Sequence, residues 1–193
     1  MTESKQKLIL RPGDVFATRN PQALGRGINA VQTWWSKDGK STYSHAGIII
    51  DEYGTTFEAT WTLKRQDLFK AYAGEKVCIA RWYGMTDQTA RDALEELMGE
   101  HEGKMYPAWR VLLHIVPAIA KYASWGGKFI VCSELVAKFL YIIYQQGNGW
   151  MDNYGYKWPR HSHYCGANPD MLSDEWHRWG CWAIVFEDVL EAP

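Results

Sequence analysis

The sequence predicts an α+β fold in which a small antiparallel sheet or half-barrel packs against a helix that begins near Cys132. Two observations support this fold class. Apolar residues recur at three- and four-residue spacing from Leu135 to Ile143, which is typical of a helix with one buried face. Short runs rich in β-branched and aromatic residues, separated by turn residues, predict strands at 15–17, 43–50, 55–60, 77–82 and 182–186.

Length and composition place the chain among globular proteins. The 193 residues fit a single domain spanning 1–193, and 47% hydrophobic with 22% charged residues argues against disorder. A net charge of -1 offers no basic surface, so we expect no nucleic-acid partner. Eleven tryptophans and eleven tyrosines favour a large, flat or apolar substrate. The oligomeric state does not follow from these numbers.

The first residues predict a polar tail that leads, through a turn at 11–14, into the strand at 15–17. Residues 28–35 favour a short helix. Because the start lacks an apolar core of signal-peptide length, we expect cytoplasmic synthesis. Action on the cell envelope would then require release or carriage on a larger particle. Four widely spaced cysteines also argue against a disulfide scaffold.

The strands at 43–50 and 55–60 are expected to form a hairpin around a turn at 51–54. With a loop of even length, Gly47 pairs with Glu58 and Ile50 with Thr55. Because side chains alternate along a strand, His45 and Glu58 then lie on one face of the sheet. The hairpin therefore predicts an imidazole beside a carboxylate.

The centre of the chain predicts a short helix within 63–73, a strand at 77–82 that buries Cys78, and an amphipathic helix capped by Thr86. The acidic residues and His101 near the end of that helix are expected to be solvated rather than to bind a metal.

Residues 109–123 are apolar but too short, and too often interrupted by charged residues and a proline, to span a bilayer. We therefore expect no integral membrane segment. A buried or lid helix is the first interpretation, and an acyl-binding wall or membrane-touching lid is the alternative. Residues 145–169 predict a long aromatic loop.

Nitrogen and sulfur ligands gather in and after this loop, at His161, His163, Cys165, His177 and Cys181. Their spacing matches no common zinc signature, so we assign no metal and expect no cofactor. The five residues stay candidates for a structural zinc site that attaches the loop to the final strand.

Cys132 is a candidate nucleophile because it begins the predicted helix. Unpaired N–H groups and the positive end of the helix dipole would lower the pKa of a thiol there. His45 is the candidate base, and Glu58 would fix the orientation of its ring. The alternative is that Cys132 is simply a small buried hydrophobic residue.

Several short motifs occur in a characteristic order, with histidine and acid before cysteine: Pro12-Gly13-Asp14-Val15-Phe16, Ser44-His45-Ala46-Gly47-Ile48, Phe57-Glu58-Ala59, Gly103-Lys104-Met105-Tyr106, Val131-Cys132-Ser133-Glu134-Leu135-Val136 and Asn168-Pro169-Asp170-Met171-Leu172. Across most of its length the chain resembles the circularly permuted NlpC-type papain-like hydrolases, the YiiX/YaeF-like group.

The resemblance implies a permuted papain-like fold and a thiol hydrolase that cleaves amide, peptide or possibly ester bonds through an acyl-enzyme. It makes Cys132 the nucleophile, His45 the base and Glu58 the orienting acid. We expect local N–H donors near Ser133 to hold the oxyanion, together with Tyr43. Peptidoglycan stem peptides or lipid-linked acyl groups are the implied substrates.

Two other functions stay open at this point. An acyltransferase of the lecithin retinol acyltransferase type would pass the same acyl group to an alcohol or amine. A non-catalytic binding module or virion component would use the aromatic loop and not the three candidate residues. A redox role is disfavoured because the sequence has no Cys-x-x-Cys pair.

Overall fold

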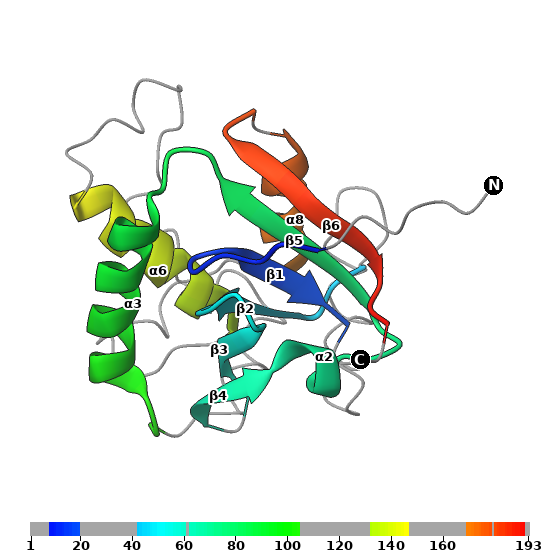
Figure 1. Ribbon diagram of the computed structural model, residues 1–193, viewed down its shortest axis with the longest axis horizontal. Coiled ribbons are helices and arrows are strands. Elements are labelled where there is room, and N and C mark those ends of the chain that lie inside the picture. Colours follow the sequence, from blue (N-terminus) through cyan, green and yellow to red (C-terminus); the bar gives the residue numbers. More distant parts are fainter. Residues whose placement is uncertain are drawn as a thin grey trace, which may run out of the picture.

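The structure is a computed structural model that describes residues 8–19, 42–60, 62–104, 132–146, 169–178 and 180–191. Within these residues, one antiparallel sheet has the strand order β4-β3-β2-β1-β5-β6 (Figure 1). Its strands are β1 (Val15–Thr18), β2 (His45–Ile49), β3 (Thr55–Ala59), β4 (Leu63–Asp67), β5 (Lys76–Trp82) and β6 (Trp182–Val189). An antiparallel sheet combined with helices confirms the α+β class at this level.

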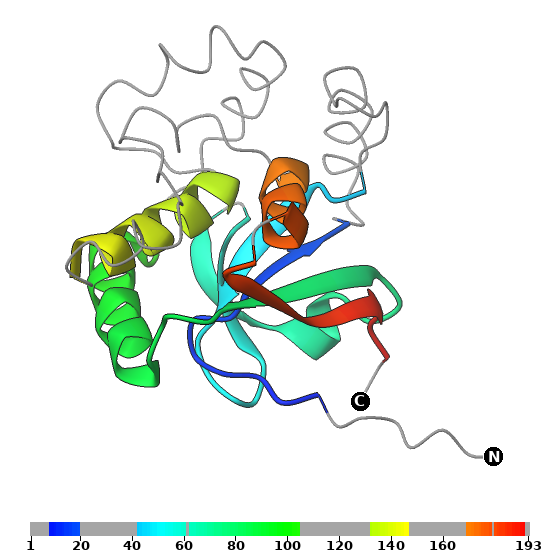
Figure 2. The same cartoon turned by 90° about the horizontal axis from the view of Figure 1, so that it is seen from above.

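The described helices are α2 (Leu68–Ala71), α3 (Asp87–His101), α6 (Cys132–Gln146) and α8 (Pro169–Arg178). Figure 2 shows α6 and α8 on the same side of the sheet. Leu68, at the start of α2, belongs instead to a smaller apolar cluster with Phe16, Ile49 and Ile79. The two sides of the sheet are therefore covered by different helices.

Helix α6 matches the predicted amphipathic pattern. Its apolar residues at three- and four-residue spacing are buried, namely Leu135, Val136, Phe139, Leu140 and Ile143. They join the larger core cluster, which also contains Ala46 and Ile48 of β2 and Phe57 of β3. Burying each of these side chains contributes about 1.5–3 kcal/mol. This packing holds the start of α6 against the two strands that carry His45 and Glu58.

The hairpin formed by β2 and β3 has the predicted register, with Gly47 opposite Glu58. The Ile50 N–H donates to the Thr55 carbonyl at 2.8 Å, which closes the four-residue loop. Inside the loop, the Asp51 carboxylate accepts hydrogen bonds from the N–H groups of Tyr53 and Thr55. The turn chemistry therefore sets the register that places Glu58 on the face of His45.

Strand β1 lies inside the sheet, between β2 and β5. At its start the Asp14 carboxylate is fully buried and receives two hydrogen bonds from Arg81 of β5, each 2.7 Å long. The Arg11 N–H also donates to Asp14, at 2.8 Å. The Gly-Asp motif is therefore a structural link between β1 and β5.

Helix α3 begins where predicted, because the Thr86 side chain accepts a hydrogen bond from the Thr89 N–H. Its last turn contacts α6 through Lys138, whose Nζ lies 2.6 Å from Glu100 and 2.7 Å from His101 Nε2. The expectation that His101 is solvated is wrong, since its side chain is only 3% exposed. The packing of α6 on α3 covers it.

The prediction of a helix within 63–73 is also wrong in part. Residues 63–67 form strand β4, and only the four residues of α2 are helical. Lys64 and Arg65 are both exposed at this edge of the sheet, so the two-residue alternation of a half-buried strand is absent from the sequence. Helix α8, which buries Trp176, was not expected.

The predicted helices at 28–35 and 109–123 lie outside the described residues, as does most of the predicted loop at 145–169. Among the helices that are described, none has the length and apolar content needed to cross a membrane.

Candidate active site

Cys132 is the first residue of α6 and is 7% exposed. The imidazole of His45, the first residue of β2, is near enough to interact with this thiol, and the interaction raises the pKa of His45. The predicted nucleophile and base therefore meet, although 87 positions separate them in the sequence. Helix packing on β2 and β3 brings them together.

His45 is held from its other side by Glu58. Its Nε2 lies 2.7 Å from Glu58 Oε2, and both side chains are buried. A carboxylate can only accept from a protonated nitrogen, so Nε2 carries a hydrogen. This leaves Nδ1 as the ring nitrogen available to exchange a proton with Cys132.

Glu58 has further donors. The Thr56 hydroxyl, on the same face of β3, donates to Oε1, and the Tyr72 hydroxyl donates to Oε2. Burial disfavours the carboxylate, but its hydrogen bonds to His45, Thr56 and Tyr72 and the charge of His45 outweigh burial and lower the pKa of Glu58. Glu58 is therefore an ionised, fully buried acceptor for the histidine.

The same balance acts on His45. Burial disfavours its charged form, yet hydrogen bonds to Cys132 and Glu58, with the negative charges of these groups, raise the pKa of His45 to about 10. The site therefore favours a protonated imidazole beside the Glu58 carboxylate and the Cys132 side chain. A cysteine nucleophile uses this charge arrangement.

Aromatic rings fix the position of the imidazole. The His45 ring lies 6.2 Å from the Phe16 ring and 5.8 Å from the Tyr72 ring, measured between centroids. Gly47 makes room for Phe16, because a Cβ at that position would lie 2.6 Å from the Phe16 ring. These contacts pack the ring on the side facing the smaller core.

Comparison with known proteins gives distant similarity to solved structures. No family model matches the chain, and no curated protein matches it. The chain is similar to the crystal structure of metalloprotein yiiX from Escherichia coli O157:H7, with a TM-score of 0.48 and 20% identity, covering 95% of this chain and 89% of that chain. This neighbour is of the YiiX type expected from the motifs, while membership of the permuted papain-like amidases stays a prediction.

The two residues expected near the oxyanion lie in different surroundings. Ser133 is buried in the first turn of α6, directly after Cys132. Tyr43 is also buried, and its hydroxyl donates to Glu187 Oε1 at 2.9 Å. The structure thus gives the Tyr43 hydroxyl a partner on β6, and its role at an oxyanion stays a prediction.

Sequence reasoning missed three residues that complete the site: Thr56, Tyr72 and Phe16. Two-residue alternation from Glu58 could have found Thr56. Tyr72 follows α2 and Phe16 lies in β1, and no local spacing links either residue to His45.

The other described cysteines have different surroundings. Cys78 is fully buried, and burial, with the charge of Glu187 as a smaller cause, raises the pKa of its thiol to about 12. Cys181 is buried as well, and its carbonyl accepts from the Tyr83 N–H just beyond β5. Cys78 therefore serves as an internal comparison for the reactivity of Cys132.

The five zinc candidates are not brought together as a set. His161, His163 and Cys165 lie outside the described residues. In the described part of the chain, His177 instead groups with Cys78 and Glu187. Cys78 lies opposite Glu187, whereas Cys181 precedes Trp182 at the other end of the same strand pair, roughly 17 Å away at the rise of a strand.

Proposed function

We propose that the protein is a cysteine hydrolase of the permuted papain-like type, which cleaves amide or peptide bonds, or esters, through an acyl-enzyme. One observation carries the proposal: His45 is hydrogen-bonded to the buried Glu58 carboxylate and interacts through the same ring with Cys132 at the start of α6. Nucleophile, base and orienting acid are within reach of one another. A buried cysteine with a purely structural role needs neither partner.

The first step follows from the charges. Cys132, having given its proton to Nδ1 of His45, attacks the carbonyl carbon of the substrate as a thiolate. Glu58 stays ionised and stabilises the imidazolium through Nε2, as its lowered pKa allows. Because Glu58 is fully buried, little solvent screens this interaction.

The second step uses the position of Cys132 on α6. The positive end of the α6 dipole lies at Cys132 and Ser133, so we propose that the first turn of this helix stabilises the developing oxyanion. The tetrahedral intermediate then collapses, and His45 gives its proton to the leaving amine or alcohol. Water attacks the thioester, which releases the acid and restores the free thiol.

For the substrate, we propose peptidoglycan stem peptides or lipid-linked acyl groups, the two classes that the family resemblance implies. The high tryptophan and tyrosine content supports a large or apolar substrate. Cytoplasmic synthesis with action on the cell envelope belongs to the same proposal.

The test is alkylation by iodoacetamide as a function of pH, with mass spectrometry to follow each cysteine in the wild type and in His45→Ala. We expect Cys132 of the wild type to react at pH 6, and its rate there to fall at least about tenfold when the imidazole is removed. Cys78 should stay unreactive in both proteins, since the pKa of its thiol is about 12.

A Cys132 that reacts no faster than Cys78, or equally in both proteins, would refute the coupled pair and favour the binding module. Substrate screening should follow only if the coupling is found. Cys132→Ala must then abolish turnover. Product analysis with an added alcohol or amine acceptor separates a hydrolase from an acyltransferase.

A further inference from the structure

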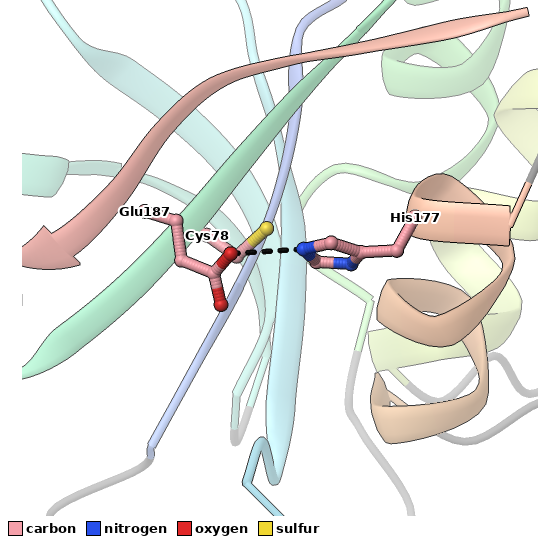
Figure 3. A group of neighbouring side chains, drawn as sticks. All are labelled: Cys78, His177 and Glu187. Atoms are coloured by element: carbon pink, nitrogen blue, oxygen red, sulfur yellow. Dashed lines mark hydrogen bonds and ion pairs between the residues drawn. The ribbon is translucent and has the colours of Figure 1, made fainter. Parts of the chain in front are cut away.

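Three side chains from three elements converge away from the candidate active site. Cys78 of β5, His177 of α8 and Glu187 of β6 place their sulfur, nitrogen and oxygen atoms within 4.8 Å of one another (Figure 3). Cys78 and Glu187 lie directly opposite each other in the sheet. His177 extends from the last turn of α8 toward both.

We propose that Cys78, His177 and Glu187 bind one zinc ion. Thiolate, imidazole and carboxylate are the three protein ligand types of zinc, and this mixture of soft and hard donors suits zinc better than magnesium or calcium. Tetrahedral bonds of the usual lengths place ligand atoms about 3.5 Å apart. Small side-chain rotations within the group reach that spacing.

The hydrogen bonds around His177 leave its Nε2 atom in a position to bind a metal ion. His177 Nδ1 donates to the Ser173 carbonyl at 2.8 Å, which fixes the ring and leaves Nε2 as the ligand nitrogen. Metal-bound histidines commonly make this contact to a backbone carbonyl. Nε2 already lies 2.8 Å from Glu187 Oε2, so the two ligand atoms point at the same place.

Glu187 is oriented in the same way. Its Oε1 accepts from the Tyr43 hydroxyl at 2.9 Å and lies 3.2 Å from Lys76 Nζ, which leaves Oε2 for the ion. The Cys78 thiolate and the Glu187 carboxylate together balance the two positive charges of the zinc ion. Lys76 contacts Glu187 but is not itself a ligand. Burying Cys78 beneath two partly exposed ligands gives the ion an entry from solvent.

Binding exchanges protons for metal bonds. The Cys78 S–H bond breaks as the sulfur–zinc bond forms, and Nε2 of His177 loses the proton that it shares with Glu187. Both protons go to solvent. The three ligands leave a fourth position for water, and the ion joins α8 to β5 and β6.

The test uses the full chain carrying Cys132→Ala, so that the candidate nucleophile cannot supply a ligand. Zinc affinity is measured against a chromophoric indicator, and cobalt(II) replaces zinc to report a thiolate-to-metal charge-transfer band. We expect one ion per chain and a melting temperature that rises with zinc. His177→Gln, a change at a partly exposed side chain, should weaken zinc binding at least about tenfold.

Cys78→Ser should abolish the charge-transfer band, whereas Cys181→Ser should leave both band and affinity unchanged. If Cys78→Ser fails to fold, His177→Gln and Glu187→Gln decide the question, because both positions are partly exposed. The site is refuted if the chain binds no zinc, if both variants bind as the parent does, or if the band is lost in Cys165→Ser and retained in Cys78→Ser.

Discussion

At the scale of single residues, Glu58 has the most demanding position. It is a fully buried carboxylate whose charge depends on donors from His45, Thr56 and Tyr72. The pKa of Tyr72 is raised by burial and by the charge of Glu58, so its phenol stays protonated and continues to donate. Tyr72 is thus a positioning residue that acts on His45 through Glu58.

Tyr72→Phe keeps the ring that packs on His45 and removes only the hydroxyl. We expect it to destabilise the protein by about 1–3 kcal/mol, because a buried carboxylate loses a donor. The alkylation of Cys132 should also shift toward the profile of His45→Ala. Urea unfolding and alkylation rates measure the two effects.

Tyr53→Phe is the matched control, since Tyr53 is 78% exposed in the hairpin loop. A Tyr72→Phe protein that is destabilised but keeps the wild-type alkylation profile would show that the hydroxyl has only a structural role.

The candidate site shows what local spacing can predict. Alternation along β2 and β3 predicted that Glu58 lies beside His45. An even number of residues in the loop between the strands is enough to put the two side chains on the same face of the sheet. Tyr72 depends on where the chain returns after β4, and the partner of Tyr43 depends on β6. Such contacts are set by tertiary packing, which residue spacing does not encode.

At the scale of elements, α3 and α6 meet at a contact that should respond to pH. His101 is nearly inaccessible to solvent, and burial, with the charge of Lys138 as a further cause, lowers its pKa to about 4. The ordinary pKa of the unfolded chain is about 6.5. Between these values the unfolded chain binds a proton that the folded protein does not.

The free energy of unfolding should therefore fall as the pH drops from about 6.5 to 4, by up to about 3 kcal/mol from this residue. His101→Gln, whose amide can still accept from Lys138, should lose this part of the pH dependence. Urea unfolding at pH 7, 5.5 and 4.5 measures it. Glu95→Gln on an exposed part of α3 is the control, and equal slopes in His101→Gln and the wild type would contradict the assignment.

At the scale of the whole molecule, the sequence predicted the element types better than their arrangement. Apolar periodicity identified α3 and α6, and β-branched runs identified β1, β2, β3 and β5. The order of the strands in the sheet could not be predicted from the sequence, because β1 pairs with β2 and with β5 through residues that are far apart along the chain. Edge strand β4 was missed because its exposed polar residues hide the alternation of a strand.

The link between Asp14 and Arg81 should affect the stability of the entire sheet. Asp14→Asn removes the charge from a fully buried group and leaves Arg81 without its carboxylate. We expect a loss of about 3 kcal/mol in the free energy of unfolding, measured in urea. Glu52→Gln, at an exposed turn position, is the control. A loss below about 1 kcal/mol would mean that the pair contributes little.

The pairing of β5 with β6 also has a consequence for synthesis on the ribosome. Strand β5 ends at Trp82, yet its partner begins only at Trp182, so the edge of β5 stays unpaired while the intervening chain emerges. That edge carries the apolar run Val77-Cys78-Ile79-Ala80. Unpaired apolar edges recruit strands from other chains. A nascent chain that pauses before β6 is therefore the form of this protein most prone to aggregate.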